Sequence, residues 1–449
     1  MSTSENSRVN QLYNMIHGDE DARACKDIPE SACHDQPKNF FAYLVANSLG
    51  KIADELASAK LILPWLLGVL GAPAIFAGFL VPIRESGILL PQLMVAAAVR
   101  HLPVRKGVWL LGAALSALAL LGMAITAYTA SGATAGWAII IALIVFSLAR
   151  GLCSVSAKDV LGKTISKGKR GVLMGYSASF AGLFILAIGA IIEMLSEKST
   201  NSSQLLLSIL LGLGAMLWVV AFISFNRINE QPGATEGGKN ALTAALHSFS
   251  LLKTDTPFRQ YVIARTLFLS IALVPPFYVL LAQSYSEDAL SGLGMLIIAG
   301  GIASSLSAPL WGKMSDKSSR KVMILAASLA GLLGVLLFAL VEEKSSLLTH
   351  PLTHAVFFMA ITLFHSGIRL GRKVYLVDLS NGENRAMYVA LSNTLIGIFM
   401  LLAGTIGLLA DIWSIQSVIL LLSLIAIASA VWTWRLPEVS LTTTTEPSK

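Results

Sequence analysis

The sequence is poor in charged residues and in cysteine. Only 13% of its 449 residues are charged and 55% are hydrophobic, whereas soluble domains carry about 25% charged residues. Because so little charge cannot cover a water-exposed surface of this size, the composition excludes an ordinary soluble protein. Three cysteines are too few for a disulfide framework. The segment from Met1 to Asn39 is polar, and we therefore expect no cleavable signal peptide.

Several chemical signatures are also missing. The chain has no alternating ten-residue segments of a β-barrel and no phosphate-binding loop of the Gly-x4-Gly-Lys-Ser/Thr type. It has no Ser–His–Asp triad with persuasive spacing. His17, Cys25, Cys33 and His34 match no zinc pattern, and we expect the tail that holds them to be structureless or surface-lying. We therefore expect no enzyme activity, no cofactor and no bound metal.

Long apolar runs are present instead, and each is long enough to cross a bilayer. When the sequence is slid along itself, one offset places Arg105 on Arg320, and a slightly longer offset places Arg150 on Arg369. The chain therefore contains an internal repeat. Hydropathy alone would make 61–83 the first span. The repeat predicts a first span over 43–68, a sharp turn over 69–73, and a second span that begins at Pro73.

The predicted fold is an all-α polytopic membrane protein with twelve transmembrane helices in two pseudo-symmetric six-helix bundles. The remaining predicted spans are 106–130, 136–159, 171–195, 203–226, 258–283, 288–312, 321–341, 352–376, 386–410 and 413–434. The predicted domains are an N-terminal tail (1–42), a first bundle (43–226), a linker (227–257), a second bundle (258–435) and a C-terminal tail (436–449).

The distribution of basic residues predicts the orientation. The links after the second, fourth, eighth and tenth spans hold 14 lysines and arginines, while the other short links hold 2. This asymmetry places both termini and the linker in the cytoplasm, and we expect the protein in a plasma (bacterial inner) membrane. The basic residues behind the net charge of +7 therefore set the orientation of the helices in the membrane, and they do not indicate nucleic-acid binding. We expect a monomer.

The basic link from Gly312 to Lys321 carries the most specific motif. Asp316 follows Gly312 by four positions, and Arg320 follows Asp316 by four more. An ordinary positively charged turn would have a similar composition. The pattern, together with two sets of six spans, resembles the loop signature of the major facilitator superfamily of secondary transporters. The first half departs from it, because His101 aligns with Asp316. The Gly-Pro motif of many antiporters in that superfamily is absent, so the direction of transport stays open.

The resemblance implies that the first, fourth, seventh and tenth helices line a central cavity. The candidates for substrate contact are Arg84, Lys60, Arg150, Arg265, His365 and Arg369. Their excess of positive charge favours a small anionic or zwitterionic organic solute. An alternative is that Arg150 and Arg369 brace the cytoplasmic loops.

Charged residues inside a span cost about 2.5–3.5 kcal/mol each at mid-depth, so they are expected to have a function or a partner. Glu85 lies beside Arg84 in an apolar helix, just after Pro82. Burial favours the neutral form of a carboxylate, which makes Glu85 the first candidate for proton coupling. Asp54 and Glu55 are the others. A structural ion pair between helices, or a register that places Arg84 and Glu85 at the outer surface, would also explain them.

Two further hypotheses follow. Lys51 and Glu55 are four residues apart and would neutralise each other on one helix face. By the resemblance, a cytoplasmic gate would pair Asp316 with the start of the eleventh helix at Arg385, and Asp378 with Arg320.

The predicted function is secondary active transport by alternating access, coupled to protons. The predicted partners are a small-molecule substrate, protons and the bilayer, without nucleic acid. A non-transporting membrane sensor or scaffold is the alternative.

Overall fold

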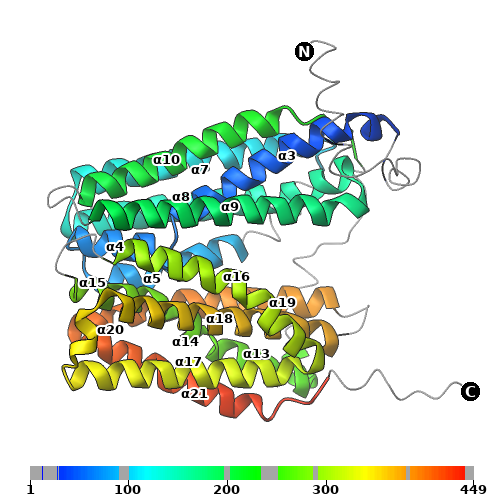
Figure 1. Ribbon diagram of the computed structural model, residues 1–449. Coiled ribbons are helices and arrows are strands. Elements are labelled where there is room, and N and C mark those ends of the chain that lie inside the picture. Colours follow the sequence, from blue (N-terminus) through cyan, green and yellow to red (C-terminus); the bar gives the residue numbers. More distant parts are fainter. Residues whose placement is uncertain are drawn as a thin grey trace, which may run out of the picture.

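The computed structural model describes residues 13, 28, 30–89, 101–196, 203–233, 251–286, 292–380 and 385–439. Every regular element in these ranges is a helix. The helices run nearly side by side in two groups, with α4, α5 and α16 between them (Figure 1). α3 begins and α21 ends at the same end of the bundle (Figure 1). We call this end the near end, and the opposite one the far end.

The helices of the first half follow the predicted order. They are α3 (Glu30–Leu56), α4 (Ile62–Val69), α5 (Ala74–Leu89), α7 (Lys106–Thr129), α8 (Gly132–Thr164), α9 (Lys167–Ser196) and α10 (Ser203–Asn226).

The second half opens with the short α12 (Leu251–Thr254), and its seventh and eleventh spans are each broken into shorter helices. The elements are α13 (Thr256–Leu267), α14 (Leu269–Leu273), α15 (Pro275–Ser284), α16 (Leu293–Lys317), α17 (Ser319–Glu342), η2 (Ser346–Thr349), α18 (Pro351–Leu379), α19 (Arg385–Ala403), η3 (Gly404–Ile406), α20 (Gly407–Ile412) and α21 (Ile415–Thr433).

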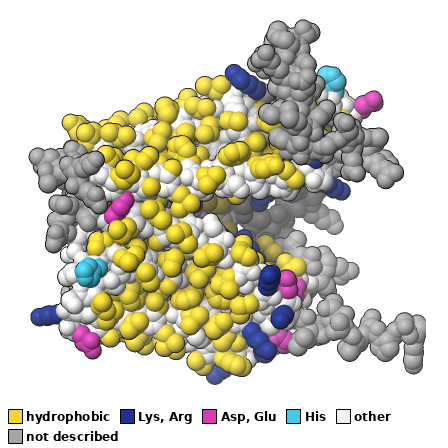
Figure 2. Space-filling model, viewed as in Figure 1, with side chains coloured by type: hydrophobic (Ala, Val, Ile, Leu, Met, Phe, Trp, Pro, Cys, Tyr) yellow, Lys and Arg dark blue, Asp and Glu magenta, His cyan; other side chains and the backbone are white. Residues whose placement is uncertain are grey.

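Ten segments of the described chain are long and apolar enough to cross a membrane. The first two positions of the predicted twelve are filled by α3 with α4, and by α5. These two spans are not among the ten apolar segments. Charged residues interrupt the span made of α3 and α4, and α5 is described only as far as Leu89. Side chains such as Leu118, Leu183 and Leu332 are more than half exposed, and hydrophobic side chains cover much of the face in Figure 2. This surface suits lipid, and the predicted twelve-helix membrane fold is confirmed.

The predicted turn before the second span is confirmed. α4 ends at Val69 and α5 begins at Ala74, so the hydropathy span over 61–83 is two helices. Gly71 has a φ of +65°, a conformation that glycine adopts without strain. The internal repeat therefore located this boundary better than hydropathy did.

The first helix begins at Glu30, earlier than the predicted 43. Its polar side chains are buried with partners: the Asn39 side chain accepts from Asn229 N at 2.8 Å, and Gln36 accepts from Ser166 N at 2.9 Å. Cys33 is disulfide-bonded, which the cysteine count did not predict. Hydropathy missed this segment because its polar groups are satisfied by hydrogen bonds to other parts of the chain.

The first span is broken between α3 and α4, at the level of Lys60. Pro64 has no N–H, and its ring clashes with the carbonyl four residues before it, which belongs to Lys60. Irregular backbone at membrane depth is tolerated where it is buried in protein or lines a water-filled cavity. The break therefore places Lys60 where an ion or substrate site would be expected.

Equivalent contacts recur in the two halves. Tyr43 of the first helix donates a hydrogen bond to the Ala157 carbonyl at 3.1 Å. Tyr261 of the seventh helix donates to the Arg372 carbonyl at 2.9 Å. Tyr43 and Tyr261 lie 218 residues apart, close to the 219 residues between Arg150 and Arg369, and the two acceptor carbonyls lie 215 residues apart. These contacts agree with the proposed repeat.

A glutamate after the last helix of each half binds the loop signature of that half. Glu230 accepts hydrogen bonds from the backbone N–H of Arg105 at 3.0 Å and of Lys106 at 2.6 Å. Glu438 accepts from the Ser318 hydroxyl at 2.8 Å and lies 3.3 Å from Arg320 Nε. Each carboxylate therefore stabilises the positive start of the next helix, α7 or α17.

Two carboxylates join the halves at the far end. Asp411 of α20 accepts hydrogen bonds from the backbone N–H of Ala74 at 2.7 Å and of Ile75 at 2.8 Å, at the start of α5. Glu193 of α9 accepts from Met295 N at 3.1 Å, at the start of α16. Each half thus supplies one carboxylate that caps a helix of the other half. We call these contacts the far-end caps.

Close glycine contacts accompany both caps. A Cβ added to Gly78 would lie 2.6 Å from the Gly404 carbonyl oxygen, and one added to Gly294 would lie 2.5 Å from the Gly189 carbonyl oxygen. α5 therefore approaches η3 and α20 at backbone distance, and α16 approaches α9 in the same way. Larger residues at Gly78 or Gly294 would push the halves apart.

At the near end the halves are separated. A Cβ added to Gly175, Gly182 or Gly312 would meet no atom within 4 Å. Figure 2 shows the molecule hollowed between the halves at this end. Of the heptad-spaced glycines of α9, only Gly189 makes a close contact with the other half. The structure is therefore closed at the far end and open at the near end.

Removing the far-end caps is expected to favour opening at the far end. A helix cap and the dipole interaction together contribute about 1–2 kcal/mol, so each loss shifts a two-state equilibrium by roughly 5–30-fold. We expect Asp411→Ala with Glu193→Ala to lengthen the distance between spin labels at Tyr128 and Leu347, which are both exposed. Pulsed electron spin resonance measures this distance. Glu342→Gln is the matched control, and an unchanged distance distribution in the double variant would contradict the role of the caps.

Candidate functional site

The first half contains a partly buried ion triad. Arg150 Nη2 of α8 lies 2.8 Å from Asp54 Oδ2 of α3, and Arg84 Nη2 of α5 lies 3.2 Å from Asp54 Oδ1. The Arg84 guanidinium also packs over the Phe146 ring at 4.8 Å, and Arg150 over Trp218 at 4.5 Å. Each arginine thus has both an anionic partner and an aromatic one. One carboxylate for two arginines leaves the triad with one excess positive charge.

The triad changes the interpretation of three candidates. Arg84 pairs with Asp54 of another helix, so the ion-pair alternative applies to Arg84 but not to its neighbour Glu85. Arg150 binds Asp54 of α3, a contact within the helices of the first half. Asp54 Oδ2 accepts hydrogen bonds from Arg150, while Oδ1 lies 3.2 Å from Arg84 without a hydrogen bond. These contacts favour a structural role for the triad.

Glu85 lies among cations without touching them. The cations with the largest electrostatic effect on its carboxyl group are Lys60, Arg372, Arg84 and Arg369, in that order. Its side chain makes no hydrogen bond or ion pair with any residue that the structure describes. Of the charged residues around Lys60, Glu85 has the largest electrostatic effect on it, followed by Arg369. Charged residues of both halves therefore lie close to one another here.

Glu55 faces the same space. Its side chain is exposed to solvent, although its electrostatic neighbours are the interior residues Asp54, Lys60, Arg84 and Arg369. A side chain surrounded by the protein and still accessible must line the hollow. The expected pair with Lys51 is not formed within the described chain, so Glu55 is not neutralised along its own helix.

Among the residues that the structure describes, the second half contributes cations and no carboxylate to this space. Arg369 and His365 of α18 lie near Lys60 and near Arg372. Of the charged residues around Arg372, Arg265 of α13 has the largest electrostatic effect on it. Arg372 was not among the predicted candidates. Its spacing of three from Arg369 and seven from His365 puts all three on one helix face, and that spacing could have identified it.

The predicted gate residues lie at the near end. Arg320 donates to the Leu436 carbonyl at 2.7 Å and lies beside Glu438, both of its own half. Asp316 is exposed near the end of α16, a helix that packs against α9 of the first half. Asp378 is exposed at the end of α18, and the Arg385 side chain lies outside the described residues. In the first half, Arg105 pairs with Asp159, the counterpart of Asp378.

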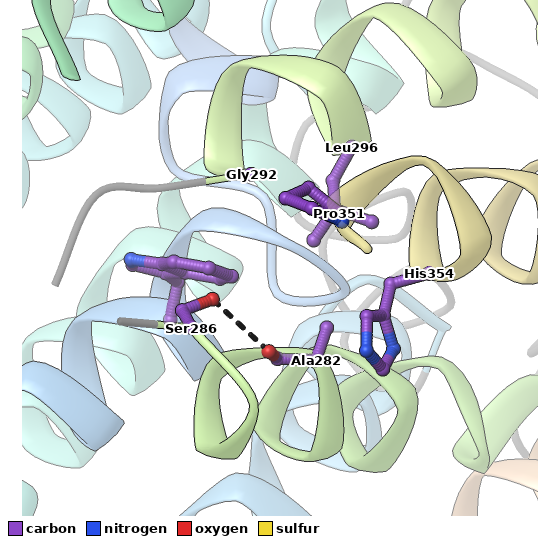
Figure 3. Close-up of a pocket in the computed structure, with 7 residues that line it drawn as sticks. Ala282, Ser286, Gly292, Leu296, Pro351 and His354 are labelled. Atoms are coloured by element: carbon purple, nitrogen blue, oxygen red, sulfur yellow. Dashed lines mark hydrogen bonds between the residues drawn. The ribbon is translucent and has the colours of Figure 1, made fainter. Parts of the chain in front are cut away.

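A small pocket at the far end is not the same site. It is lined by Trp65, Ala282, Ser286, Gly292, Leu296, Pro351 and His354 (Figure 3). Its polar groups are engaged, since Ser286 donates to the Ala282 carbonyl at 3.1 Å and His354 Nε2 lies 2.8 Å from the Leu348 carbonyl. No cluster of His, Cys, Asp and Glu suited to a metal occurs in the described part of the chain.

The fold and the apolar surface define a multi-pass membrane protein with charged groups around an interior hollow. A protein-family model with the description Major Facilitator Superfamily matches residues 262–449 of the sequence. The chain therefore has the fold of that superfamily, and its second half carries the superfamily's sequence pattern. The resemblance predicted from the loop signature is confirmed.

Solved structures cover nearly the whole chain. A D-xylose–proton symporter matches with a TM-score of 0.68 and 12% identity, over 90% of this chain and 99% of its own. The nucleoside transporter NupG matches with a TM-score of 0.62 and 13% identity, over 89% and 99%. A POT family transporter in complex with 5-aminolevulinic acid matches with 0.67 and 12%, over 91% and 98%. No curated protein matches. At these identities the similarity establishes the fold alone.

Proposed function

We propose that the protein is a secondary active transporter of a small organic anion or zwitterion, driven by a proton gradient through alternating access. One observation carries the proposal: acids and cations from both halves face each other, without direct contact, in a hollow open at one end. Unpaired charge is too costly inside a bilayer to be retained without a function. The fold neighbours described as a proton symporter and as nucleoside and POT family transporters support it.

The two halves, residues 43–226 and 258–435, are the moving bodies in this proposal. They are joined by the far-end caps and separated at the near end, so rocking about the hollow would exchange one opening for the other. We assign the near end to the cytoplasm, because the basic links lie there, and the membrane to the plasma (bacterial inner) membrane. Closure of the near end would bring Asp316 of α16 to the basic start of α9.

Glu85 is the proposed proton carrier, with Glu55 as the second candidate. When Glu85 is charged, it compensates Lys60 and Arg372. When it binds a proton, these cations become available to an anion. Proton and substrate would thus be coupled through the same cations, while Asp54 stays bound to its two arginines.

Counterflow in proteoliposomes tests transport directly. We expect liposomes preloaded with a small organic anion to accumulate labelled anion from outside, with no accumulation in empty liposomes. A sensor or scaffold is favoured by one observation, the replacement of the loop aspartate by His101 in the first half. Binding of a solute without counterflow of any solute would support the sensor and contradict transport.

A further inference from the structure

We propose that the second half contains an anion-binding subsite, built from Arg265, Arg369 and Arg372, for a doubly charged organic anion. The proposal rests on the proposed function and specifies its substrate class. The two ligand types that fit are a dicarboxylate and a phosphate monoester.

Arg265 is the buried part of the subsite. It is 6% exposed, and its two terminal nitrogens donate to Ser392 Oγ and to Asn393 Oδ1, both at 2.7 Å. Both partners are neutral, and Nε has no partner in the described chain. A buried guanidinium without a carboxylate is costly. An anionic ligand would supply the missing negative charge.

Arg372 and Arg369 extend the subsite towards the hollow. Tyr261 binds the Arg372 carbonyl at 2.9 Å from α13, the helix of Arg265, which brings α18 close to α13. Neither the Arg372 guanidinium nor that of Arg369 has a hydrogen bond or ion pair with a described residue. The arginines thus form a row from the buried Arg265 to the exposed Arg369.

The charge balance gives the ligand charge. Within the described chain, the three arginines and Lys60 are cations without a contacting acid, and the acids that share the hollow are Glu55 and Glu85, both counted here in their charged form. Two positive charges remain, and the Asp54 triad adds one more. A doubly charged anion therefore balances the two positive charges that remain outside the triad, whereas a neutral solute leaves them uncompensated. Guanidinium groups bind carboxylates and phosphates in bidentate fashion, so both groups suit the row.

The test uses the purified full-length protein, with thermal stabilisation as the measurement of binding. The probes are succinate and glycerol 3-phosphate at mildly alkaline pH, compared with the singly charged butyrate and with neutral glycerol. We expect at least one doubly charged probe to stabilise the protein, with butyrate and glycerol at least about tenfold weaker. The probe that binds distinguishes the dicarboxylate from the phosphate monoester.

Variants locate the binding site. We expect Arg372→Gln and the exposed Arg369→Gln to weaken the bound probe by about tenfold or more, while Lys253→Gln, which removes an exposed positive charge elsewhere, changes it less than twofold. Arg369→Gln, at an exposed position, keeps the test valid if Arg372→Gln does not fold. Equal binding of butyrate, no binding of either doubly charged probe, or unchanged affinity in both arginine variants would overturn the subsite. Counterflow of a neutral solute would then show that transport stands while the subsite fails.

Discussion

Replacing Glu85 by Gln is expected to abolish accumulation of substrate driven by a pH gradient, while exchange of substrate across the membrane continues. Gln has the size of Glu but cannot carry a negative charge. It therefore never compensates Lys60 and Arg372, which stay available to the substrate. Coupling free energies of about 1–3 kcal/mol change affinity by roughly 5–150-fold. If Glu85 couples proton and substrate binding, the substrate affinity of the parent protein depends on pH by a factor in this range. We expect this dependence to disappear in the variant.

Two measurements in proteoliposomes check the prediction: uptake against an imposed pH gradient, and counterflow at equal pH. Glu55→Gln is the parallel variant, and Glu342→Gln, an exposed position near the end of α17, is the control. If Glu85→Gln accumulates substrate as the parent does and Glu55→Gln does not, Glu55 is the carrier. If both variants accumulate normally, neither glutamate couples transport to protons.

Replacing Asp54 by Asn is expected to destabilise the protein strongly. The change leaves Arg84 and Arg150 without their carboxylate inside the first half. Removing one partner of a fully buried ion pair costs about 3–5 kcal/mol. Because the Asp54 side chain is 22% exposed, we expect about 2–3 kcal/mol here after discounting for solvent screening. Thermal unfolding in detergent should show a melting temperature several degrees lower.

The matched comparison is Glu55→Gln, on the adjacent residue, which has no contacting partner to lose. We expect its melting temperature to stay close to that of the parent. A fully stable Asp54→Asn protein that has lost only its proton coupling would contradict the structural role and return Asp54 to the proton carriers.

The sequence predicted the helices well because their length and apolar character are local properties. The turn between Val69 and Ala74 was predicted correctly, although hydropathy contradicted it, because the repeat transferred information from the second half. The early start at Glu30 was not predicted, since Gln36 and Asn39 are polar and find their hydrogen-bond partners far along the chain. Their burial depends on tertiary contacts that no local pattern contains.

The sequence predicted most of the residues of the charged site, but not which of them contact one another. Asp54 and Glu55 are adjacent, yet Asp54 binds two arginines while Glu55 faces the hollow. The pairing depends on how each helix is rotated about its axis, and a single sequence does not fix that rotation to within one residue. The far-end caps were missed for a similar reason, because Asp411 and Glu193 act on backbone N–H groups, which any sequence carries.

The most direct test of the account is the accessibility of Ser58, two residues before Lys60 in the break between α3 and α4. A protein with Ser58→Cys and no other cysteine would be treated with a membrane-impermeant thiol reagent from each side. We predict labelling from the near side at rest, and additional labelling from the far side during turnover. Equal labelling from both sides at rest, or none from either side, would contradict a central site with alternating access.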